Sequence, residues 1–157
     1  MRHSISIILG IVVFSLATVA TAAAEQAEVS SVIDGDTLKI QIGTATDTVR
    51  FLGIDTPETV HPSKLVQCFG REASAKMKQL VEGKTVTLER NPAEERDKYG
   101  RLLRYIQIGD EDIGATMIRE GFAFSYKQYP HPRLEEYNAL EREARESSVG
   151  LWAEGAC

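Results

Sequence analysis

The stretch "AEVSSVIDGDTLKIQIG" (residues 27–43) has the pattern of a β-hairpin. Asp34 and Gly35 form a turn signal between two extended runs. In the second run, residues 38–42, apolar side chains alternate with more polar ones at the period of two that is typical of a strand with one buried face. The folded part of the chain is therefore expected to open with two antiparallel strands.

Strand and helix patterns continue after this hairpin. Residues 46–55, "TDTVRFLGID", predict a third strand that Gly53 bends, and residues 70–83 switch to the spacing of an amphipathic helix. The remaining predicted elements are strands over 84–90 and 101–108, a helix over 112–121 with Asp112 as its N-cap, and a helix over 134–144. Five short strands with inserted helices favour a small α+β barrel, and a length of 157 residues favours one domain.

The first 24 residues have the composition of a secretory signal peptide. A basic start precedes the uncharged apolar run "ISIILGIVVFSLATV" (5–19), and the small residues Ala22 and Ala24 suit cleavage at this point. The alternative is an uncleaved membrane anchor. The sequence thus predicts a signal peptide over 1–24 and an exported domain over 25–157, periplasmic or secreted, with membrane association only if the first segment stays attached.

Two cysteines, Cys68 and Cys157, lie in the exported part. Because export exposes the chain to oxidising conditions, a disulfide between them is expected. Free or intermolecular thiols are the alternative. No CxxC pair is present, so thiol redox catalysis has no support.

The exported part is acidic. Without residues 1–24 the chain carries 17 Lys and Arg residues against 23 Asp and Glu residues, a net charge of −6. This balance argues against a broad phosphate-binding surface. An anionic substrate would need a local site.

Six short motifs lie in order along the chain: "VIDGDT" (32–37), "VRFLGIDTPET" (49–59), "HP" (61–62), "EASA" (72–75), "DKYGR" (97–101) and "REGFA" (119–123). Together they resemble the staphylococcal nuclease (thermonuclease) family, and the similarity extends from about Val29 to Trp152. The resemblance implies an OB-fold, a five-stranded β-barrel with three α-helices. It also implies a secreted Ca²⁺-dependent nuclease that cleaves DNA and RNA with little sequence preference and leaves 3′-phosphate ends.

The resemblance also implies the site residues. Asp36 and Asp55 match the carboxylate ligands of Ca²⁺, Thr56 matches a ligand through its backbone carbonyl, and Glu58 matches the general base. The predicted phosphate-binding and nucleotide-contacting residues are Arg50, Arg101, Lys98, Tyr99 and either Tyr126 or Tyr129. The spacing in "SYKQYP" leaves the choice between these two tyrosines open.

The residue types fit this chemistry independently of the resemblance. Carboxylate and carbonyl oxygens suit Ca²⁺ or Mg²⁺, whereas zinc prefers several His or Cys ligands. The planar guanidinium of Arg50 or Arg101 matches two phosphate oxygens and stays charged. His61 is interpreted as structural or substrate-adjacent, and His131, between two prolines, as a loop residue.

Several other residues are given structural roles. Tyr105 and Trp152 are expected to pack, and Arg104 is expected to be an ordinary surface charge. The charged residues of the last helix are interpreted as its solvent face, with an i,i+4 pair between Glu141 and Arg145.

An alternative function comes from another class of protein. OB-folds also bind single-stranded nucleic acid without cutting it, through exposed aromatic and basic residues. The paired carboxylates and arginines favour the enzyme. The sequence indicates no protein partner, and a monomer is expected.

Overall fold

Five strands form a β-barrel in this computed structural model, which describes residues 25–60, 65–91 and 93–157. The strands are β1 (Glu25–Val32), β2 (Thr37–Ile42), β3 (Ala45–Phe51), β5 (Thr85–Arg90) and β6 (Leu102–Ile108). They lie in the order β3-β2-β1-β5-β6, and a parallel pairing between β3 and β6 closes the barrel. The five strands predicted from the sequence are confirmed.

The structure also contains three two-residue strands. β7 (Glu111–Asp112) pairs antiparallel with β6, and β4 (Ile54–Asp55) pairs with β8 (Phe124–Ser125) in a separate small sheet. Ile54 and Asp55 fall within the strand predicted over 46–55, which the structure divides at Gly53 into β3 and β4. β7 and β8 were not predicted, because two residues are too few to show a period.

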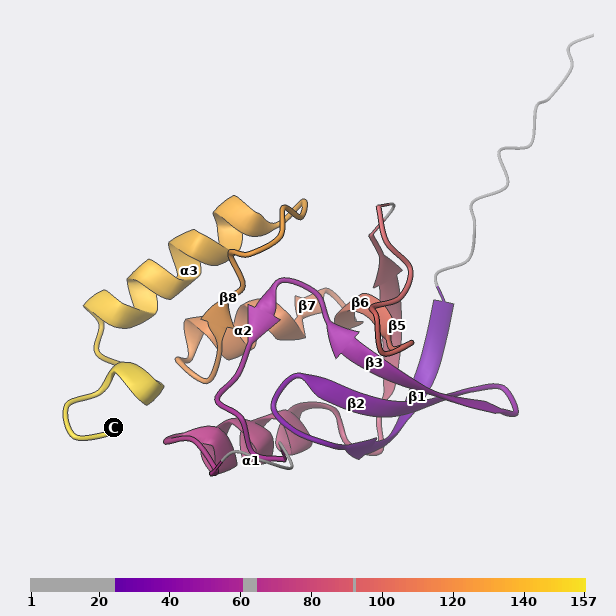
Figure 1. The fold of residues 1–157 in the computed structure, drawn as a ribbon, viewed down its shortest axis with the longest axis horizontal. Coiled ribbons are helices and arrows are strands. Elements are labelled where there is room, and N and C mark those ends of the chain that lie inside the picture. The colour runs from indigo at the N-terminus through magenta and orange to yellow at the C-terminus, as the bar shows by residue number, and fades with distance from the viewer. Residues whose placement is uncertain (1–24, 61–64, 92) are drawn as a thin grey trace, which may run out of the picture.

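The three predicted helices are also present. They are α1 (Gly70–Val81), α2 (Ile113–Arg119) and α3 (Leu134–Glu146), and a 3₁₀ turn, η1 (Gly150–Trp152), follows. Figure 1 shows α1 beneath the barrel strands, with α2 near the centre and α3 beyond it. Asp112 caps α2 as expected, because its Oδ1 accepts the backbone N–H of Ala115 at 3.1 Å.

The barrel and the helices enclose one hydrophobic core. Its largest fully buried apolar side chains are Leu38, Ile40, Ile54, Met77, Tyr105, Ile106, Ile113, Met117, Ile118 and Tyr137. Tyr105 therefore packs as predicted. Trp152 also packs, with its ring edge-on to Phe124 at 5.3 Å between centroids.

Arg104 contradicts the expectation of a surface charge. It lies in β6 and is fully buried, and its Nη2 atom bonds to Glu95 at 2.6 Å and lies 3.5 Å from Glu25. β6 pairs with β3 on one side and β5 on the other, so this strand has no solvent-facing edge at Arg104. The guanidinium therefore lies near Glu25, the first residue of β1, and links this start of the barrel to Glu95.

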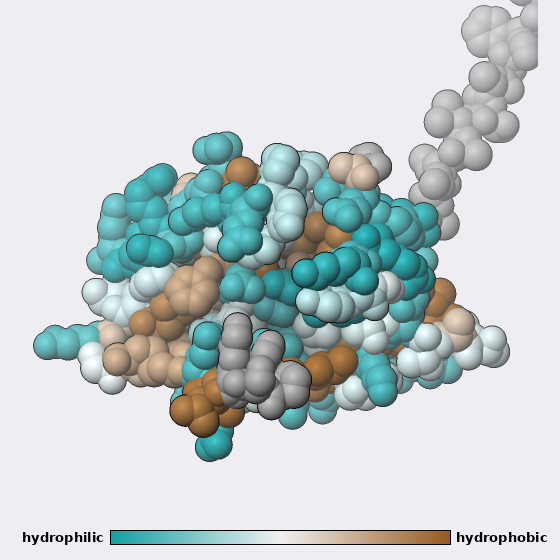
Figure 2. Space-filling model, in the orientation of Figure 1, coloured by the Kyte–Doolittle hydropathy of each residue, from teal (hydrophilic) through white to brown (hydrophobic). Residues whose placement is uncertain are grey.

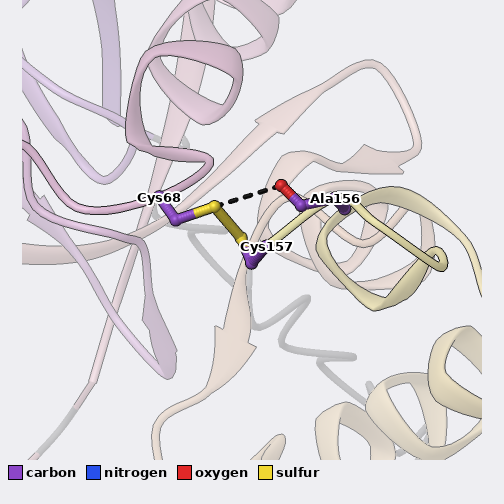
Figure 3. The surroundings of a disulfide bond; sticks show 3 residues. All are labelled: Cys68, Ala156 and Cys157. Carbon is purple, nitrogen blue, oxygen red and sulfur yellow. Dashed lines mark hydrogen bonds between the residues drawn. A yellow bond between two sulfur atoms is a disulfide. The ribbon is translucent and has the colours of Figure 1, made fainter.

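The predicted disulfide between Cys68 and Cys157 is present, with the two Cα atoms 5.7 Å apart. Figure 3 shows that it ties the C-terminus to the turn before α1, where Sγ of Cys68 also lies 3.1 Å from the carbonyl oxygen of Ala156.

The surface over α3 is mainly hydrophilic (Figure 2).

The predicted signal or anchor over 1–24, and His61, lie outside the described residues. Within the described ranges, no helix has the length and apolar character needed to cross a membrane.

Candidate active site

Arg50 near the end of β3 lies between two carboxylates, one in the turn before β2 and one in β4. Its Nε atom is 3.1 Å from Oδ1 of Asp36, and its Nη2 atom is 2.9 Å from Oδ1 of Asp55. Nη1 donates to the carbonyl oxygens of Phe51 and Ile54 at 2.9 and 2.8 Å. All three guanidinium nitrogens are therefore fixed, and the side chain is only 14% exposed. This fork holds the turn before β2 and the bend after β3 in one place.

Asp36 is oriented by the bend that carries Thr56. Its Oδ2 accepts both the backbone N–H and the hydroxyl of Thr56, each at 2.9 Å, and its Oδ1 accepts the Thr37 hydroxyl at 3.1 Å. Gly35 permits this approach, because a Cβ at that position would lie 2.6 Å from Oγ1 of Thr56. Gly35 therefore both forms the hairpin turn and leaves space for the Thr56 side chain next to Asp36.

Gly53 directs the chain from β3 into the site. Its φ of +76° belongs to the left-handed region that favours glycine, which confirms the predicted bend. Beyond it, Asp55 lies opposite Phe124 in the small β4–β8 sheet. The next residue after β8, Tyr126, donates its backbone N–H to the carbonyl oxygen of Gly53 at 2.8 Å. The bend thus brings Asp55 and Tyr126 to the same edge.

Of the two candidate tyrosines, Tyr126 lies beside Arg50 in the structure. The Arg50 guanidinium carbon lies 5.9 Å from the centroid of the Tyr126 ring. The Tyr129 ring is tilted against that of Tyr126, with 5.9 Å between centroids, and Tyr129 is 65% exposed. The two tyrosines thus form one aromatic pair next to Arg50.

A second cluster comes from the "DKYGR" loop, which is organised by Asp97. Oδ1 of Asp97 accepts the backbone N–H groups of Tyr99 and Arg101, and Oδ2 accepts Nε of Arg101 at 2.7 Å. Nζ of Lys98 and the Arg101 guanidinium lie 5.0 and 5.4 Å from the Tyr99 ring centroid. Tyr99 is 72% exposed and has two cations near its ring, and exposed aromatic rings beside cations are typical of surfaces that bind single-stranded nucleic acid.

Electrostatics connect the two clusters at Tyr126. Burial, Tyr129 and Asp55 raise the pKa of the Tyr126 hydroxyl, while Arg50 from one cluster and Lys98 from the other act to lower it. Arg50 in β3 and Lys98 in the "DKYGR" loop are far apart in sequence, and both act on the Tyr126 hydroxyl.

Glu58 lies in the loop that follows β4. Its Oε1 accepts the backbone N–H groups of Thr59 and Val60 at 2.9 and 2.8 Å. Among the described residues, no hydrogen bond or ion pair joins Glu58 to Arg50 or Asp36. The carboxylate is therefore fixed by its own loop, and its second oxygen is not used in those two bonds.

Asp36, Asp55 and the Thr56 carbonyl are the oxygen donors that the sequence predicted for a metal ion. Within the described ranges, no three His, Cys, Asp or Glu side chains converge as ligands. Asp36 and Asp55 nevertheless both lie within 3.1 Å of one cationic group, Arg50, so two carboxylates already share a positive charge. Together with the Thr56 carbonyl and water they would make an all-oxygen set, and oxygen ligands suit Ca²⁺ or Mg²⁺ better than zinc.

Comparison with known proteins identifies the family. The family model described as "Staphylococcal nuclease homologue" matches residues 48–154, more than half of the chain. The chain belongs to the staphylococcal nuclease family. This confirms the resemblance found in the motifs, and the five-stranded mixed barrel with three helices agrees with the predicted OB-fold of the family.

Three relatives of this staphylococcal nuclease homologue carry nuclease names. The thermonuclease of Staphylococcus intermedius is 39% identical over 128 residues, which cover 79% of this chain and 74% of the relative. Endonuclease YncB and the SPbeta prophage-derived endonuclease YokF, both from Bacillus subtilis, are each 37% identical over 123 residues, or 77% of this chain. These matches cover 58% of YncB and 42% of YokF, so the chain spans about half the length of the two Bacillus enzymes.

The site of this nuclease homologue also contains carboxylates to which sequence reasoning gave no role at the site. Asp34, interpreted as a turn residue, accepts the backbone N–H of Asp36 at 3.1 Å, which agrees with that interpretation. Burial and the adjacent Asp36 also raise its pKa to about 6. Asp97 belongs to the recognised motif "DKYGR". Its hydrogen bonds to Arg101 could have been predicted only if the motif had been interpreted as a turn closed by the aspartate side chain.

Glu141 corrects the interpretation of the last helix as a solvated exterior. The predicted pair with Arg145 is present, but Glu141 is only 2% exposed. Its Oε2 accepts the backbone N–H of Ser125 at 3.0 Å and pairs with Lys127 at 3.0 Å. Glu141 therefore anchors α3 to β8, the strand that leads directly to Tyr126.

Glu141 makes the stability of the fold depend on pH. Burial acts to raise the pKa of Glu141, but the hydrogen bonds from Lys127 and Ser125 and the charges of Lys127 and Arg145 outweigh it and lower the pKa. A lowered pKa stabilises the fold above the ordinary glutamate pKa, and this contribution is lost as the pH falls through the lower folded value.

We expect Glu141→Gln to lower the free energy of unfolding at pH 7 by about 2 kcal/mol, because a charged hydrogen-bond acceptor becomes neutral. Urea unfolding at pH 7 and below about pH 4 measures the effect, and the deficit should shrink at the lower pH. Glu143→Gln, on the exposed side of α3, is the control. A deficit that is the same at both pH values would contradict the role of the charge.

Proposed function

We propose that this chain is a metal-dependent nuclease that hydrolyses phosphodiester bonds at the Asp36–Arg50–Asp55 centre. The observation that carries the proposal is the Arg50 fork, which joins two carboxylates and lies beneath the Tyr126 ring. Such a centre offers oxygen ligands, a planar phosphate-binding cation and a stacking surface within one small region. The names of the relatives support the nuclease class and nucleic acid as the substrate.

The roles of the individual residues follow from their chemistry. Asp36, Asp55 and the Thr56 carbonyl would hold Ca²⁺, which supplies positive charge to the phosphate oxygens and acidifies bound water. Arg50 and Arg101 bind the phosphate and neutralise the charge that grows on it. Glu58 accepts the proton of the attacking water. The water oxygen bonds to phosphorus, the bond from phosphorus to the 5′-oxygen breaks, and the 5′-oxygen takes a proton from solvent, which leaves a 3′-phosphate and a 5′-hydroxyl.

The acidic balance of the chain bears on substrate binding. With a net charge of −6 over residues 25–157, long-range attraction to nucleic acid is weak, so binding depends on the local cations and on stacking. Lys98, Tyr99 and Tyr126 supply these contacts without reading base edges, which supports cleavage of DNA and RNA with little sequence preference. The disulfide supports export of the domain to an oxidising compartment.

The function is tested by incubating residues 25–157 with single-stranded DNA and, separately, with RNA, in Ca²⁺ and in a chelator. We expect cleavage of both polymers only with the metal, and products whose 3′ ends accept no nucleotide until a phosphatase has acted. Binding without cleavage under Ca²⁺, Mg²⁺ and Mn²⁺ would favour the alternative of a noncatalytic OB-fold module.

Arg50→Lys tests the fork directly. Lysine keeps the charge but contacts one partner as a point charge, so it does not hold Asp36, Asp55 and a phosphate together. We expect kcat/KM on single-stranded DNA to fall about 100-fold. Arg71→Lys, on the exposed face of α1, is the matched control. Cleavage at the wild-type rate by Arg50→Lys would show that Arg50 does not take part in catalysis.

A further inference from the structure

The loop between β4 and α1 is closed by two hydrogen bonds at its base. The backbone N–H of Glu58 donates to the side-chain oxygen Oε1 of Gln67 at 2.8 Å, and the backbone N–H of Gln67 donates to the carbonyl oxygen of Glu58 at 2.9 Å. Gln67 thus satisfies both polar groups of the Glu58 backbone. No sequence motif indicated this contact.

The start of α1 is packed directly against the same segment. A Cβ at Gly70 would lie 3.0 Å from the Pro57 carbonyl oxygen, 3.1 Å from the Glu58 carbonyl oxygen and 2.8 Å from Cγ2 of Thr59. Gly70 also donates its backbone N–H to the Gln67 carbonyl oxygen at 3.1 Å. The Glu58 segment, Gln67 and the first residue of α1 therefore form one packed unit, which we call the Glu58 clasp.

The Cys68–Cys157 disulfide follows Gln67 in the chain. Cys157 ends a segment that is held to the helical layer, because Leu151 donates its backbone N–H to the Gly121 carbonyl oxygen at 2.8 Å. On the other side of the disulfide, the Phe69 ring lies 5.5 Å from that of Phe122. Figure 3 shows the covalent link between the turn before α1 and the C-terminus. The clasp is thus anchored at the residue that adjoins Gln67.

We propose that Gln67 is a positioning residue for Glu58 and that the Cys68–Cys157 disulfide holds Gln67 in place. The Glu58 carboxylate is oriented by the N–H groups of Thr59 and Val60, so its direction follows the backbone that Gln67 fixes. A shift of that backbone moves the carboxylate, and small misplacements of catalytic groups cost large factors in rate. The inference rests on the proposed role of Glu58 as the proton acceptor.

A matched set of variants tests the role of Gln67. Gln67→Leu removes the acceptor for the Glu58 N–H, Gln67→Glu keeps one, and Gln79→Leu makes the same change on the exposed face of α1. We expect Gln67→Leu to lower kcat about tenfold or more with little change in KM. The kcat of Gln67→Glu should stay within about threefold of the wild-type value, and the kcat of Gln79→Leu should equal the wild-type value.

Amide hydrogen exchange by NMR provides a readout that does not depend on activity. In Gln67→Leu, exchange at the Glu58 and Gln67 amides should become about tenfold faster or more, while the barrel amides keep their protection. For Cys68→Ser combined with Cys157→Ser, which lowers global stability, the readout is the amide chemical shift of the folded protein, and the largest changes away from the two substituted residues and their immediate neighbours should include the Glu58 amide. A Glu58 amide shift that is unchanged in this variant would overturn the role of the disulfide.

Different results would overturn the positioning role of Gln67 and the proposed nuclease function. Wild-type turnover in Gln67→Leu, or a change in KM alone, would overturn the positioning role even if the nuclease is active. A wild-type protein without nuclease activity would overturn the proposed function, and the exchange rates at Glu58 and Gln67 would still decide whether the clasp exists.

Discussion

Replacing Glu58 with glutamine is expected to lower kcat on single-stranded DNA about 1000-fold with little change in KM, because the variant cannot accept the proton of the attacking water. Glutamine keeps a side-chain oxygen that can accept the N–H groups of Thr59 and Val60, so the loop should retain its conformation. The change therefore separates the chemistry of the carboxylate from its position. Initial rates in saturating Ca²⁺ give kcat and KM.

Two comparisons make this result interpretable. Glu143→Gln removes an exposed charge from α3 and should cleave DNA like the wild type. Exchange protection at the Glu58 amide should be the same in Glu58→Gln and the wild type, because the Gln67 acceptor is intact. An unchanged kcat in Glu58→Gln would show that Glu58 takes no proton and would assign the attacking water to another group.

Removing the disulfide is expected to lower the free energy of unfolding by about 4 kcal/mol. The bond joins residues 89 positions apart, so its loss releases a long loop in the unfolded chain. Cys68→Ser combined with Cys157→Ser avoids free thiols, and urea unfolding of both proteins gives the difference. The melting temperature should fall by roughly 10–20 °C.

The core contacts of the barrel do not depend on this bond, so the variant should still fold at low temperature. Its far-ultraviolet circular dichroism should match that of the wild type before unfolding. A loss of less than about 1 kcal/mol would mean that the C-terminus is held by its packing, through Leu151 and Trp152, and not by the covalent link.

The strand pattern predicted the barrel because each main strand has a regular alternation that one buried face requires. Leu38 and Ile40 in β2 are fully buried, while Lys39 between them is exposed. The bend at Gly53 and the cap at Asp112 were predicted for a similar reason, since both follow from local backbone chemistry.

Contacts between distant segments were not predictable in the same way. Arg104 lies in an apolar strand and Glu141 in a highly charged helix, and both are buried where their elements pack against others, β6 against β3 and α3 against β8. Burial of a charge requires partners from other elements, which a local pattern does not reveal. The pairing of Gln67 with Glu58 is likewise a contact across a loop.

The candidate site shows both situations. The motifs indicated Asp36, Arg50 and Asp55, and the structure brings them into one ion-paired cluster. Their catalytic and metal-binding roles remain predictions. The position of Tyr126 beside Arg50 could not be predicted from spacing, because it depends on the pairing of β8 with β4.

The calcium dependence of DNA cleavage by Asp36→Asn, beside the wild type, tests the central claim most directly. Asparagine can still accept the hydroxyl and N–H of Thr56, so the turn is kept while one charged ligand is lost. The account predicts that the Ca²⁺ concentration for half-maximal rate rises about tenfold or more, and that a chelator abolishes cleavage by both proteins. Cleavage that persists in the chelator, or an unchanged calcium curve in Asp36→Asn, would contradict a metal-dependent centre built on Asp36, Arg50 and Asp55.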